Sequence, residues 1–402
     1  MKKKLLVAVM AITATLCCAL WFTACGESKP KEMEFSLSED GTYYILSGIG
    51  GCTDTEIIIP SEYGGLPVTE IGTTAFLRCR DIVSVTIPDS VTKIGIRAFD
   101  GCSGITSITI PDSVTEMGWG AFEYCTGLTS ITIPDSITAI DKHTFSDCTG
   151  LKSVTIGSGV NEIYDNPFRG CSNIESFTVD EANVRYYSQG NCIIIWNKRL
   201  ISGCKNSIIP DNVVEIGKDA FQGIGFKSIT IPNGVKEIGE NAFNNCKNLS
   251  GITIPDSVTE IGNNAFSWCV SLKSVTIPDS VTRIGSGVFR ECTALTSITI
   301  PDNVTEIGSG MFSACSSLTS FTIPDGVTKI GMSAFELCEN FKSVTIPAGV
   351  KQIDMHAFAF CNRLTSITFK GTKAQWNAIS KEEDWNRNTN NYTVHCTDGD
   401  IK

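Results

Sequence analysis

Cysteine is the residue type whose number and spacing first suggest chemistry in this chain of 402 residues, 18 of them cysteines. Eleven of the cysteines recur every 23 residues in two runs, from Cys79 to Cys171 and from Cys246 to Cys361. Structural zinc sites instead pair ligands about two to four residues apart. A disulfide ladder needs Cα atoms about 4.4–6.8 Å apart, whereas neighbouring helices pack at about 8–10 Å. We therefore interpret this column as buried, reduced thiols, with no metal.

The other residues that could do chemistry are dispersed. The three histidines, His143, His356 and His395, lie in different parts of the chain. There is no H-E-x-x-H, no glycine-rich phosphate loop and no nucleophile elbow. We therefore predict no catalytic residue, no cofactor and no enzymatic activity.

A column of aspartates follows a column of prolines. Aspartate after proline is typical of turns, in which its side chain bonds to the nearby backbone, and weak collection of divalent cations is the alternative. The members of this column are Asp89, Asp112, Asp135, Asp211, Asp256, Asp279, Asp302 and Asp325.

All these columns belong to a repeat of 23 residues, shown by Leu249–Ser271, LSGITIPDSVTEIGNNAFSWCVS. Ile252 and Ile254 alternate with small or polar residues, which predicts a short strand with one buried face. Pro255 and Asp256 then favour a type I turn. The residues Ile261, Ala265 and Cys269 lie four apart, so we expect one face of a short helix there, with Phe266 beside it. A single coil cannot bury these apolar side chains, but a stack of coils can.

The unit resembles the BspA-like class of leucine-rich repeats, whose pattern is L-x-x-I-x-I-P-x-x-V-x-x-I-x-x-x-A-F-x-x-C-x-x. The match runs from about Phe35 to the C-terminus and recurs about a dozen times. The resemblance implies an α/β repeat fold, a right-handed leucine-rich-repeat solenoid with a parallel sheet. It also implies a cell-surface protein, since several such proteins are adhesins.

The departures from the repeat divide the chain into one elongated solenoid and its ends. Residues 35–81 are predicted to form the N-terminal cap and first rung, and 82–369 the solenoid, with a hairpin insertion at 180–204. Residues 370–402 form the C-terminal cap, where Thr372 and Gln375 match a capping box at the start of a short helix.

The N-terminus has the features of a bacterial lipoprotein signal. Residues 1–24 contain the basic segment Lys2–Lys4 and the apolar run Leu5–Phe22. The following Phe-Thr-Ala-Cys resembles a lipoprotein cleavage box, which implies a lipid on Cys25 and a tether over 25–34. A plain secretory signal and an uncleaved anchor helix are the alternatives.

Two sets of side chains are candidates for ligand binding. Hydroxyl residues occupy the outward positions of successive strands, among them Thr253, Thr276 and Thr299, although threonine is also simply a good residue for a strand surface. Tyr124 and Trp268 lie just before the cysteine column, where exposed aromatic residues could anchor a partner or pack between coils.

The insertion reads as a hairpin with Asn197–Arg199 as its loop. This pairing places Cys192 opposite Cys204, at a spacing that suits a disulfide; two free thiols in a hairpin that bridges two coils are the alternative. The hairpin is also expected to protrude and to present three aromatic side chains to a partner: Tyr186, Tyr187 and Trp196.

Charge excludes some partners. The formal net charge is −11, and loss of residues 1–24, with three lysines and no acid, makes it about −14. An acidic chain without a basic run is a poor ligand for nucleic acid or anionic lipid. The expected function is non-catalytic binding of macromolecules at the cell surface, with adhesion to host or neighbouring-cell proteins implied by the resemblance. A lipoprotein that captures polysaccharide and an envelope scaffold without a ligand are the alternatives.

Replacement of Cys25 by Ser should abolish lipid attachment and leave the precursor unprocessed, because the thiol would be the acylated group. Metabolic labelling with a fatty acid, followed by electrophoresis, measures this directly. Labelling that persists in the Cys25→Ser protein would contradict the lipoprotein interpretation.

Overall fold

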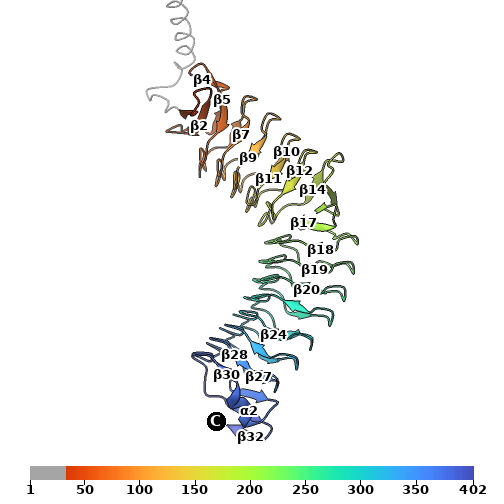
Figure 1. The fold of residues 1–402 in the computed structure, drawn as a ribbon. Helices are drawn as coiled ribbons and strands as arrows, with labels where there is room; N and C mark the ends of the chain where they lie inside the picture. The colour runs from red at the N-terminus through yellow and green to blue at the C-terminus, as the bar shows by residue number, and fades with distance from the viewer. Residues whose placement is uncertain (1–32) are drawn as a thin grey trace, which may run out of the picture.

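The structure, a computed structural model, describes residues 33–402 and shows a long stack of coils that curves from the N-terminal to the C-terminal cap (Figure 1). Each coil has three sides: one strand, a second strand, and an edge made of consecutive turns. The predicted signal peptide, Cys25 and most of the tether lie outside the described residues. In residues 33–402, no helix has the length and apolar character needed to cross a membrane.

The first side is a row of parallel strands that we name the Ser/Thr face. Identical positions pair from coil to coil, for example Ser130 with Ser153 and Thr132 with Thr155. Serine and threonine therefore point outward in rows while isoleucine and valine point inward, as the alternation predicts. The strands are β3 (Glu56–Ile58), β6 (Ser84–Thr86), β8 (Ser107–Ile108), β10 (Ser130–Ile133), β12 (Ser153–Ile156), β14 (Ser176–Val179), β21 (Ser274–Thr276), β23 (Ser297–Thr299), β25 (Ser320–Thr322), β27 (Ser343–Ile346) and β29 (Ser366–Phe369).

The second side is another row of short parallel strands, the Glu/Ile face, which the sequence analysis did not anticipate. In most coils only two residues pair, as Glu237 and Ile238 do with Glu260 and Ile261. A run this short has no alternation from which a strand could be predicted. The strands are β5 (Leu66–Ile71), β7 (Lys93–Ile94), β9 (Glu116–Met117), β11 (Ala139–Ile140), β13 (Glu162–Ile163), β18 (Glu215–Ile216), β19 (Glu237–Ile238), β20 (Glu260–Ile261), β22 (Arg283–Ile284), β24 (Glu306–Ile307), β26 (Lys329–Ile330), β28 (Gln352–Ile353) and β30 (Ser380–Lys381).

The third side contains no helix, so the expectation of a short helix in each coil is wrong. In the coil of Phe266, residues 263–268 form consecutive turns. Asn264 and Trp268 have φ angles of +54° and +63°, outside the right-handed helical region. The Phe266 N–H donates to Val288 O in the next coil, not to a carbonyl four residues earlier. A spacing of four thus shows which side chains face inward, but not whether the backbone bonds are local.

A stack of phenylalanine rings fills the core behind this turn edge. Neighbouring rings such as Phe243 and Phe266 have centroids 5.3 Å apart and planes 1° apart. The column is fully buried and repeats in twelve coils, which confirms the expectation for Phe266: 76, 99, 122, 145, 168, 221, 243, 266, 289, 312, 335 and 358.

The insertion is part of the stack and does not protrude as predicted. Its strands β15 (Tyr186–Gln189), β16 (Cys192–Ile195) and β17 (Arg199–Gly203) join the Glu/Ile face through β18. Their side chains divide the apolar interior into two clusters, one toward each end of the molecule. The hairpin is therefore a partition between two half-solenoids.

The predicted pairing of Cys192 with Cys204 is wrong. Cys192 faces Gly203, because the loop begins one residue earlier than expected and the register shifts between Ile193 and Ile194. A shift of one residue turns a strand's side chains to the opposite face. Both cysteines are buried free thiols, Cys192 in one apolar cluster and Cys204 in the other.

Caps close both ends of the stack. At the N-terminus, β1 (Glu34–Leu37) and β2 (Tyr44–Gly48) form an antiparallel pair beside β5, which also pairs with β4 (Glu62–Tyr63). At the C-terminus, the predicted capping box begins α2 (Lys373–Ala378), whose Trp376 packs on Phe369. The last strands are β31 (Thr393–Cys396) and β32 (Gly399–Ile401).

Replacement of Phe266 by Ala should lower the free energy of unfolding by about 3–5 kcal/mol, because it removes a fully buried ring and its two stacking partners. Repeats couple mainly to their neighbours, so we expect a split unfolding transition in denaturant titrations. The exposed Thr253→Ala of the same coil is the control, with an effect of under about 0.5 kcal/mol. Equal effects of both changes would contradict a buried phenylalanine column.

Candidate binding surfaces

The cysteine column consists of free thiols that are buried as the sequence predicts, except for the partly exposed Cys79 in the first coil. From Cys102 onward, each Sγ donates to the carbonyl oxygen of the phenylalanine 25 or 26 residues earlier; Cys269 Sγ lies 3.2 Å from Phe243 O. The thiol thus makes a second hydrogen bond to a carbonyl of the preceding coil, since Phe243 O also accepts from the backbone N–H of Cys246. Burial raises the pKa of Cys102, Cys269 and Cys361 to about 12, which removes nucleophilic thiolate at these positions at neutral pH. At Cys148 burial also opposes ionisation, but hydrogen bonds to Cys125 and Cys171 lower the pKa to about 5, so this thiol is protected by its complete burial alone.

The polar residues considered for catalysis or metal binding remain dispersed. Within residues 33–402, no three His, Cys, Asp or Glu side chains converge as a metal site would require. His143 packs beside Trp119 and lies 3.5 Å from Glu123, and His395 lies 3.0 Å from Asp400. In the aspartate column, Asp135 accepts from the backbone N–H of Ser158 in the next coil. The aspartate side chain thus links neighbouring coils, which differs from the expected bond within its own turn.

The threonines of the Ser/Thr face are exposed as predicted. Thr276 pairs with Thr299 in register, and Thr253 forms a bridge to Thr230. Every rung presents nearly the same hydroxyl groups, so this face offers a repetitive ligand many equivalent contacts but cannot distinguish one site from another.

The aromatic residues of the insertion have different environments. Tyr186 is 2 % exposed, and its hydroxyl accepts from the backbone N–H of Ile163, so its predicted role as a contact residue is wrong. It is buried because β15 lies inside the stack. Tyr187 and Trp196 do form a surface pair, with ring centroids 4.7 Å apart and Trp196 60 % exposed.

The turn edge contains two columns of residues with left-handed backbone conformation. The first, the Phe-side column, lies two residues before each phenylalanine except Phe168: Thr74, Arg97, Gly120, His143, Asp219, Asn241, Asn264, Gly287, Gly310, Ser333 and His356. The second, the Cys-side column, lies just before each cysteine or its equivalent Ile224: Arg78, Gly101, Tyr124, Asp147, Gly170, Gly223, Asn245, Trp268, Glu291, Ala314, Leu337 and Phe360.

Each residue of the Cys-side column combines a positive φ angle with a hydrogen bond between coils. The N–H of Tyr124 donates to Ser146 O and that of Trp268 to Arg290 O, each in the following coil. The same bond recurs from Arg78 to Phe360. The left-handed conformation of these residues costs a residue with a side chain about 1–2 kcal/mol, and glycine almost nothing.

The residue types of the two columns differ in a way that the backbone alone does not explain. The Phe-side column has glycine, asparagine, aspartate, serine or histidine everywhere except at Thr74 and Arg97. The Cys-side column, with the same backbone requirement, has large residues such as Tyr124, Trp268 and Leu337, which are 49, 45 and 43 % exposed. Large residues held in an unfavourable conformation at the surface indicate a function other than folding.

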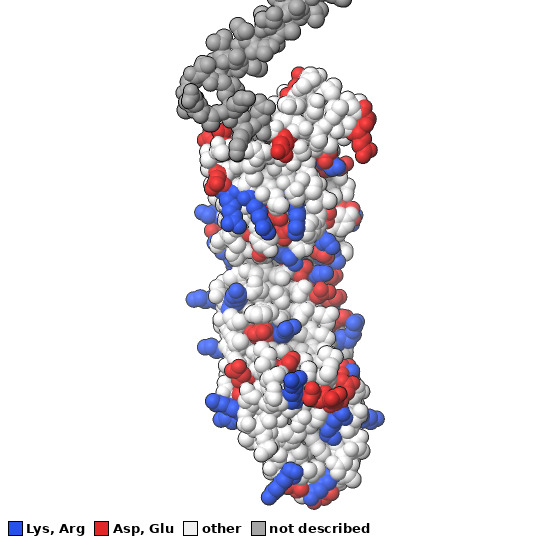
Figure 2. All heavy atoms as spheres, turned by 90° about the vertical axis from the view of Figure 1, so that its left-hand side faces the viewer, with Lys and Arg blue, Asp and Glu red and all other residues white. Residues whose placement is uncertain are grey.

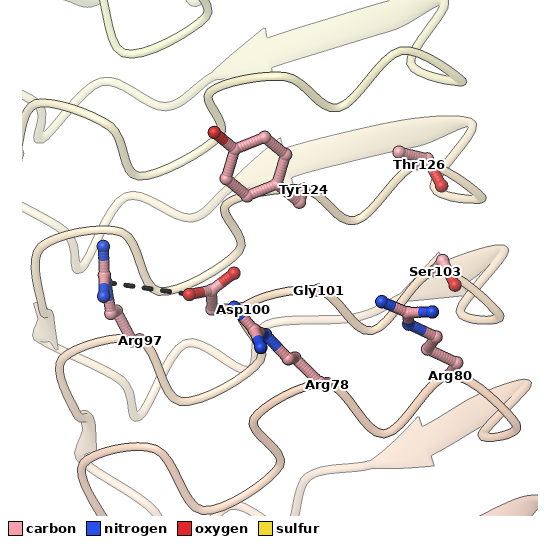
Figure 3. A pocket seen from close by; sticks show the side chains of 8 residues that line it. All are labelled: Arg78, Arg80, Arg97, Asp100, Gly101, Ser103, Tyr124 and Thr126. Atoms are coloured by element: carbon pink, nitrogen blue, oxygen red, sulfur yellow. Dashed lines mark ion pairs between the residues drawn. The ribbon is translucent and has the colours of Figure 1, made fainter.

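Where glycine occupies the Cys-side column near the N-terminus, the surface forms a groove of about 560 Å³. Gly101 lies between Arg78 of the preceding coil and Tyr124 of the following one (Figure 3). Arg80, Arg97 and Asp100 line the groove further, with Ser103 and Thr126 at its side (Figure 3). A groove therefore forms where one coil lacks a side chain that its neighbours have.

Charges in the groove are positive at its surface and negative beneath it. The Arg97 guanidinium lies 4.6 Å from the centre of the Trp119 ring and forms ion pairs with Asp100 and Glu123 at 3.6 and 3.7 Å. Asp100 and Glu123 are buried, and burial raises the pKa of both carboxyls although Arg97 opposes the shift. Arg78 and Arg80 are exposed, and neither has an ion-pair partner in residues 33–402. Figure 2 shows basic side chains gathered near the N-terminal end of the face it displays.

Sequence analysis identified only part of this arrangement. It selected Tyr124 and Trp268 from the variable position before each cysteine, but it missed Arg80, Arg97 and Gly101. The spacing of 23 residues from Arg78 through Gly101 to Tyr124 was available as a signal that these positions are neighbours. Only the structure shows that the residues of the Cys-side column share a left-handed backbone conformation.

Comparison with known proteins supports the repeat interpretation. The family described as "BspA type leucine rich repeat region" matches residues 69–194, 201–293 and 259–382. A leucine-rich cell surface protein from Faecalibacterium prausnitzii is 31 % identical, with a TM-score of 0.62 over 90 % of this chain and 99 % of its own. The fold is also shared with a leucine-rich repeat protein from Eubacterium ventriosum (23 % identity, TM-score 0.62, 92 % and 97 % of the two chains). It is shared too with the pneumococcal vaccine antigen PcpA (19 % identity, TM-score 0.60, 90 % and 97 % of the two chains). No curated protein matches the chain.

The thiol column should be inert toward alkylation in the native protein. A thiol of pKa about 12, as at Cys269, is ionised in roughly one molecule in ten thousand at about pH 8, and its burial blocks access. Iodoacetamide followed by peptide mapping should leave Cys102–Cys361 unlabelled in the native protein and label them all after denaturation. Cys52 and Cys396, which are partly exposed, serve as internal controls. Native labelling of Cys269 would contradict this account.

Proposed function

Because this chain belongs to the BspA-type leucine-rich-repeat family, we propose that it is an exported, lipid-anchored surface protein that binds macromolecules without catalysing a reaction. The lipid would be attached to Cys25, and the tether over 25–34 would separate the solenoid from the membrane. The similar Faecalibacterium protein is described as a cell surface protein, which supports this location. The preferred partners are proteins of a host or of neighbouring cells, so the role is that of an adhesin.

The observation that carries this proposal is the Cys-side column. The Ser/Thr face presents serine and threonine in most coils, and the outward position of the Glu/Ile face varies mainly among charged and other polar residues. The Cys-side column instead presents arginine, tyrosine, aspartate, tryptophan, glutamate, leucine and phenylalanine in turn. Partner recognition needs such differences, and aromatic residues and arginine are enriched at the centres of binding interfaces. The strain of about 1–2 kcal/mol per large residue is a stability–function compromise that a spacer would have no reason to keep.

A non-enzymatic role agrees with the rest of the molecule. The family is a repeat scaffold, and the comparisons point to no enzyme family. The phenylalanine stack and the thiol column from Cys102 onward are both buried and stabilise the fold.

Replacement of Trp268 by Gly should separate binding from folding. Glycine relieves the left-handed strain, so we expect the free energy of unfolding to rise by about 1 kcal/mol while adhesion weakens. The matched control changes the other candidate surface, with Thr253, Thr276 and Thr299 all replaced by Ala, and should leave adhesion intact. Cells that display the full chain are tested on immobilised extracellular proteins and glycans, and stability is measured by denaturant titration.

Each other outcome contradicts part of the proposal. Loss of stability in Trp268→Gly would mean that the indole packs between coils and is no anchor. Loss of adhesion only in the triple threonine variant would show that the partner binds to the Ser/Thr face. Adhesion to glycans alone would favour capture of polysaccharide, and no adhesion to any surface would favour a spacer.

A further inference from the structure

We infer that the groove around Gly101 binds an acidic sugar unit, with Arg78 and Arg80 contacting its carboxylate or sulfate and Tyr124 packing on its ring. This inference deepens the proposed function by naming a ligand class for one part of the Cys-side column. Its basis is the geometry of three consecutive coils and the charges that line them.

The size of the groove follows from the missing side chain at Gly101. Successive coils of a parallel stack are about 4.8 Å apart, so Arg78 and Tyr124, which are two coils apart, are separated by roughly 10 Å along the column. A Cβ on Gly101 would lie 3.1 Å from Arg78 Cγ, so even an alanine would narrow the space. The volume of about 560 Å³ is within the range of about 300–1,000 Å³ that is typical of small-ligand sites.

The charge of the groove selects an anion. The chain as a whole is acidic, with a net charge of −11, yet three arginines converge on this groove, and Asp100 is the one acidic residue that lines it. Asp100 is buried and ion-paired with Arg97, and it also lies within electrostatic reach of Arg78, so one carboxylate is shared between two of the three arginines and the lining keeps a net positive charge. The buried Nε–H of Arg97 faces the Asp100 carboxylate at 3.6 Å. Planar guanidinium groups suit carboxylate and sulfate because they can donate two parallel hydrogen bonds.

Other residues around the groove favour a sugar over other anions. The half-exposed Tyr124 offers an aromatic face to an apolar ring surface, and its hydroxyl can bond to a polar group. Ser103 and Thr126 add hydroxyl groups suited to a ligand with many hydroxyls. A nucleic acid would need phosphate contacts along an extended surface, and the acidic chain provides this basic patch only locally.

The strained backbone of the lining residues supports a binding role independently of charge. Arg78, Arg97 and Tyr124 have φ angles of +58°, +52° and +57°. Arg97 is moreover one of only two residues in the Phe-side column that are not glycine, asparagine, aspartate, serine or histidine. Three large residues in unfavourable conformations thus meet at one groove.

The experiment uses the full chain purified in detergent and calorimetric titration with four probes. Sialyllactose presents a sugar carboxylate, a heparin octasaccharide presents sulfates, lactose is the neutral control, and a short polyglutamate peptide carries charge without a sugar. We expect one or both acidic glycans to bind, and lactose and polyglutamate to bind at least tenfold more weakly. Binding of sialyllactose would identify a carboxylate as the recognised group, and binding of the heparin octasaccharide would identify a sulfate.

Three variants locate the binding. Arg78→Gln and Arg80→Gln remove charge without removing length, and each should weaken binding at least tenfold. Gly101→Asn fills the groove with a residue that tolerates the left-handed conformation, so it should block binding while the protein stays folded. Arg363→Gln, an exposed arginine near the opposite end, is the matched charge control and should have no effect.

The inference is overturned if neither acidic glycan binds, if polyglutamate binds as tightly as the glycans, or if Arg363→Gln weakens binding as much as Arg78→Gln. It is overturned also if Gly101→Asn remains folded and binds normally. Failure here leaves the proposed function standing, because adhesion through Trp268 in the other half of the solenoid does not depend on this groove. Conversely, glycan binding by the purified chain does not depend on where the cell places it.

Discussion

The hydrogen bond that a left-handed residue donates to the next coil is the interaction on which this structure depends. It alternates along the turn edge with local bonds, such as that from Ser267 N–H to Asn264 O, so each coil's edge is held partly by its own turns and partly by its neighbour. It sets the same register in successive coils, and that register brings the phenylalanine rings into a stack with centroids 5.3 Å apart at Phe243 and Phe266. The phenylalanine carbonyls accept from the cysteine N–H of their own coil and from the cysteine thiol of the following coil. The regular core and the exposed Cys-side column are thus two results of one backbone requirement.

The insertion shows how far this constraint extends. The hairpin β15–β17 divides the apolar interior into two clusters and interrupts the phenylalanine stack between Phe168 and Phe221. The turn edge nevertheless continues across it, since the N–H of Gly170 donates to Gln222 O and the Asn166 side chain donates to Asp219 O. Both Cys-side residues at this junction, Gly170 and Gly223, are glycine, and a Cβ on Gly223 would lie 3.0 Å from Gly170 Cα. The edge is therefore the continuous element, and the core is interrupted.

Function follows from the places where the repeat is not uniform. The Ser/Thr face and the buried columns are nearly the same in every coil, so they can stabilise but cannot distinguish ligands. The Cys-side column varies, and its large residues carry a conformational strain that the equivalent Phe-side positions avoid. At the N-terminal end this variation produces the groove between Arg78 and Tyr124, where arginines converge in an otherwise acidic molecule. A repeat scaffold can in this way carry several local sites at separate coils.

The sequence by itself determined the coil period, the inward-facing residues and the C-terminal capping box. These depend on local chemistry: isoleucine alternation gives strands such as β10 at 130–133, although at 252–254 only Thr253 pairs, and Thr372 with Gln375 begins α2. Only the tertiary structure decided how the backbone satisfies its donors. The spacing of Ile261, Ala265 and Cys269 fits a helix, but the N–H of Phe266 bonds to the next coil. Likewise the register shift in the hairpin places Cys192 opposite Gly203. Tyr186 is buried because its strand lies inside the stack. Contacts between coils join residues about 23 positions apart, and no local pattern contains the geometry of such a bond; for that reason Gly101 and Arg97 became part of a site only in three dimensions.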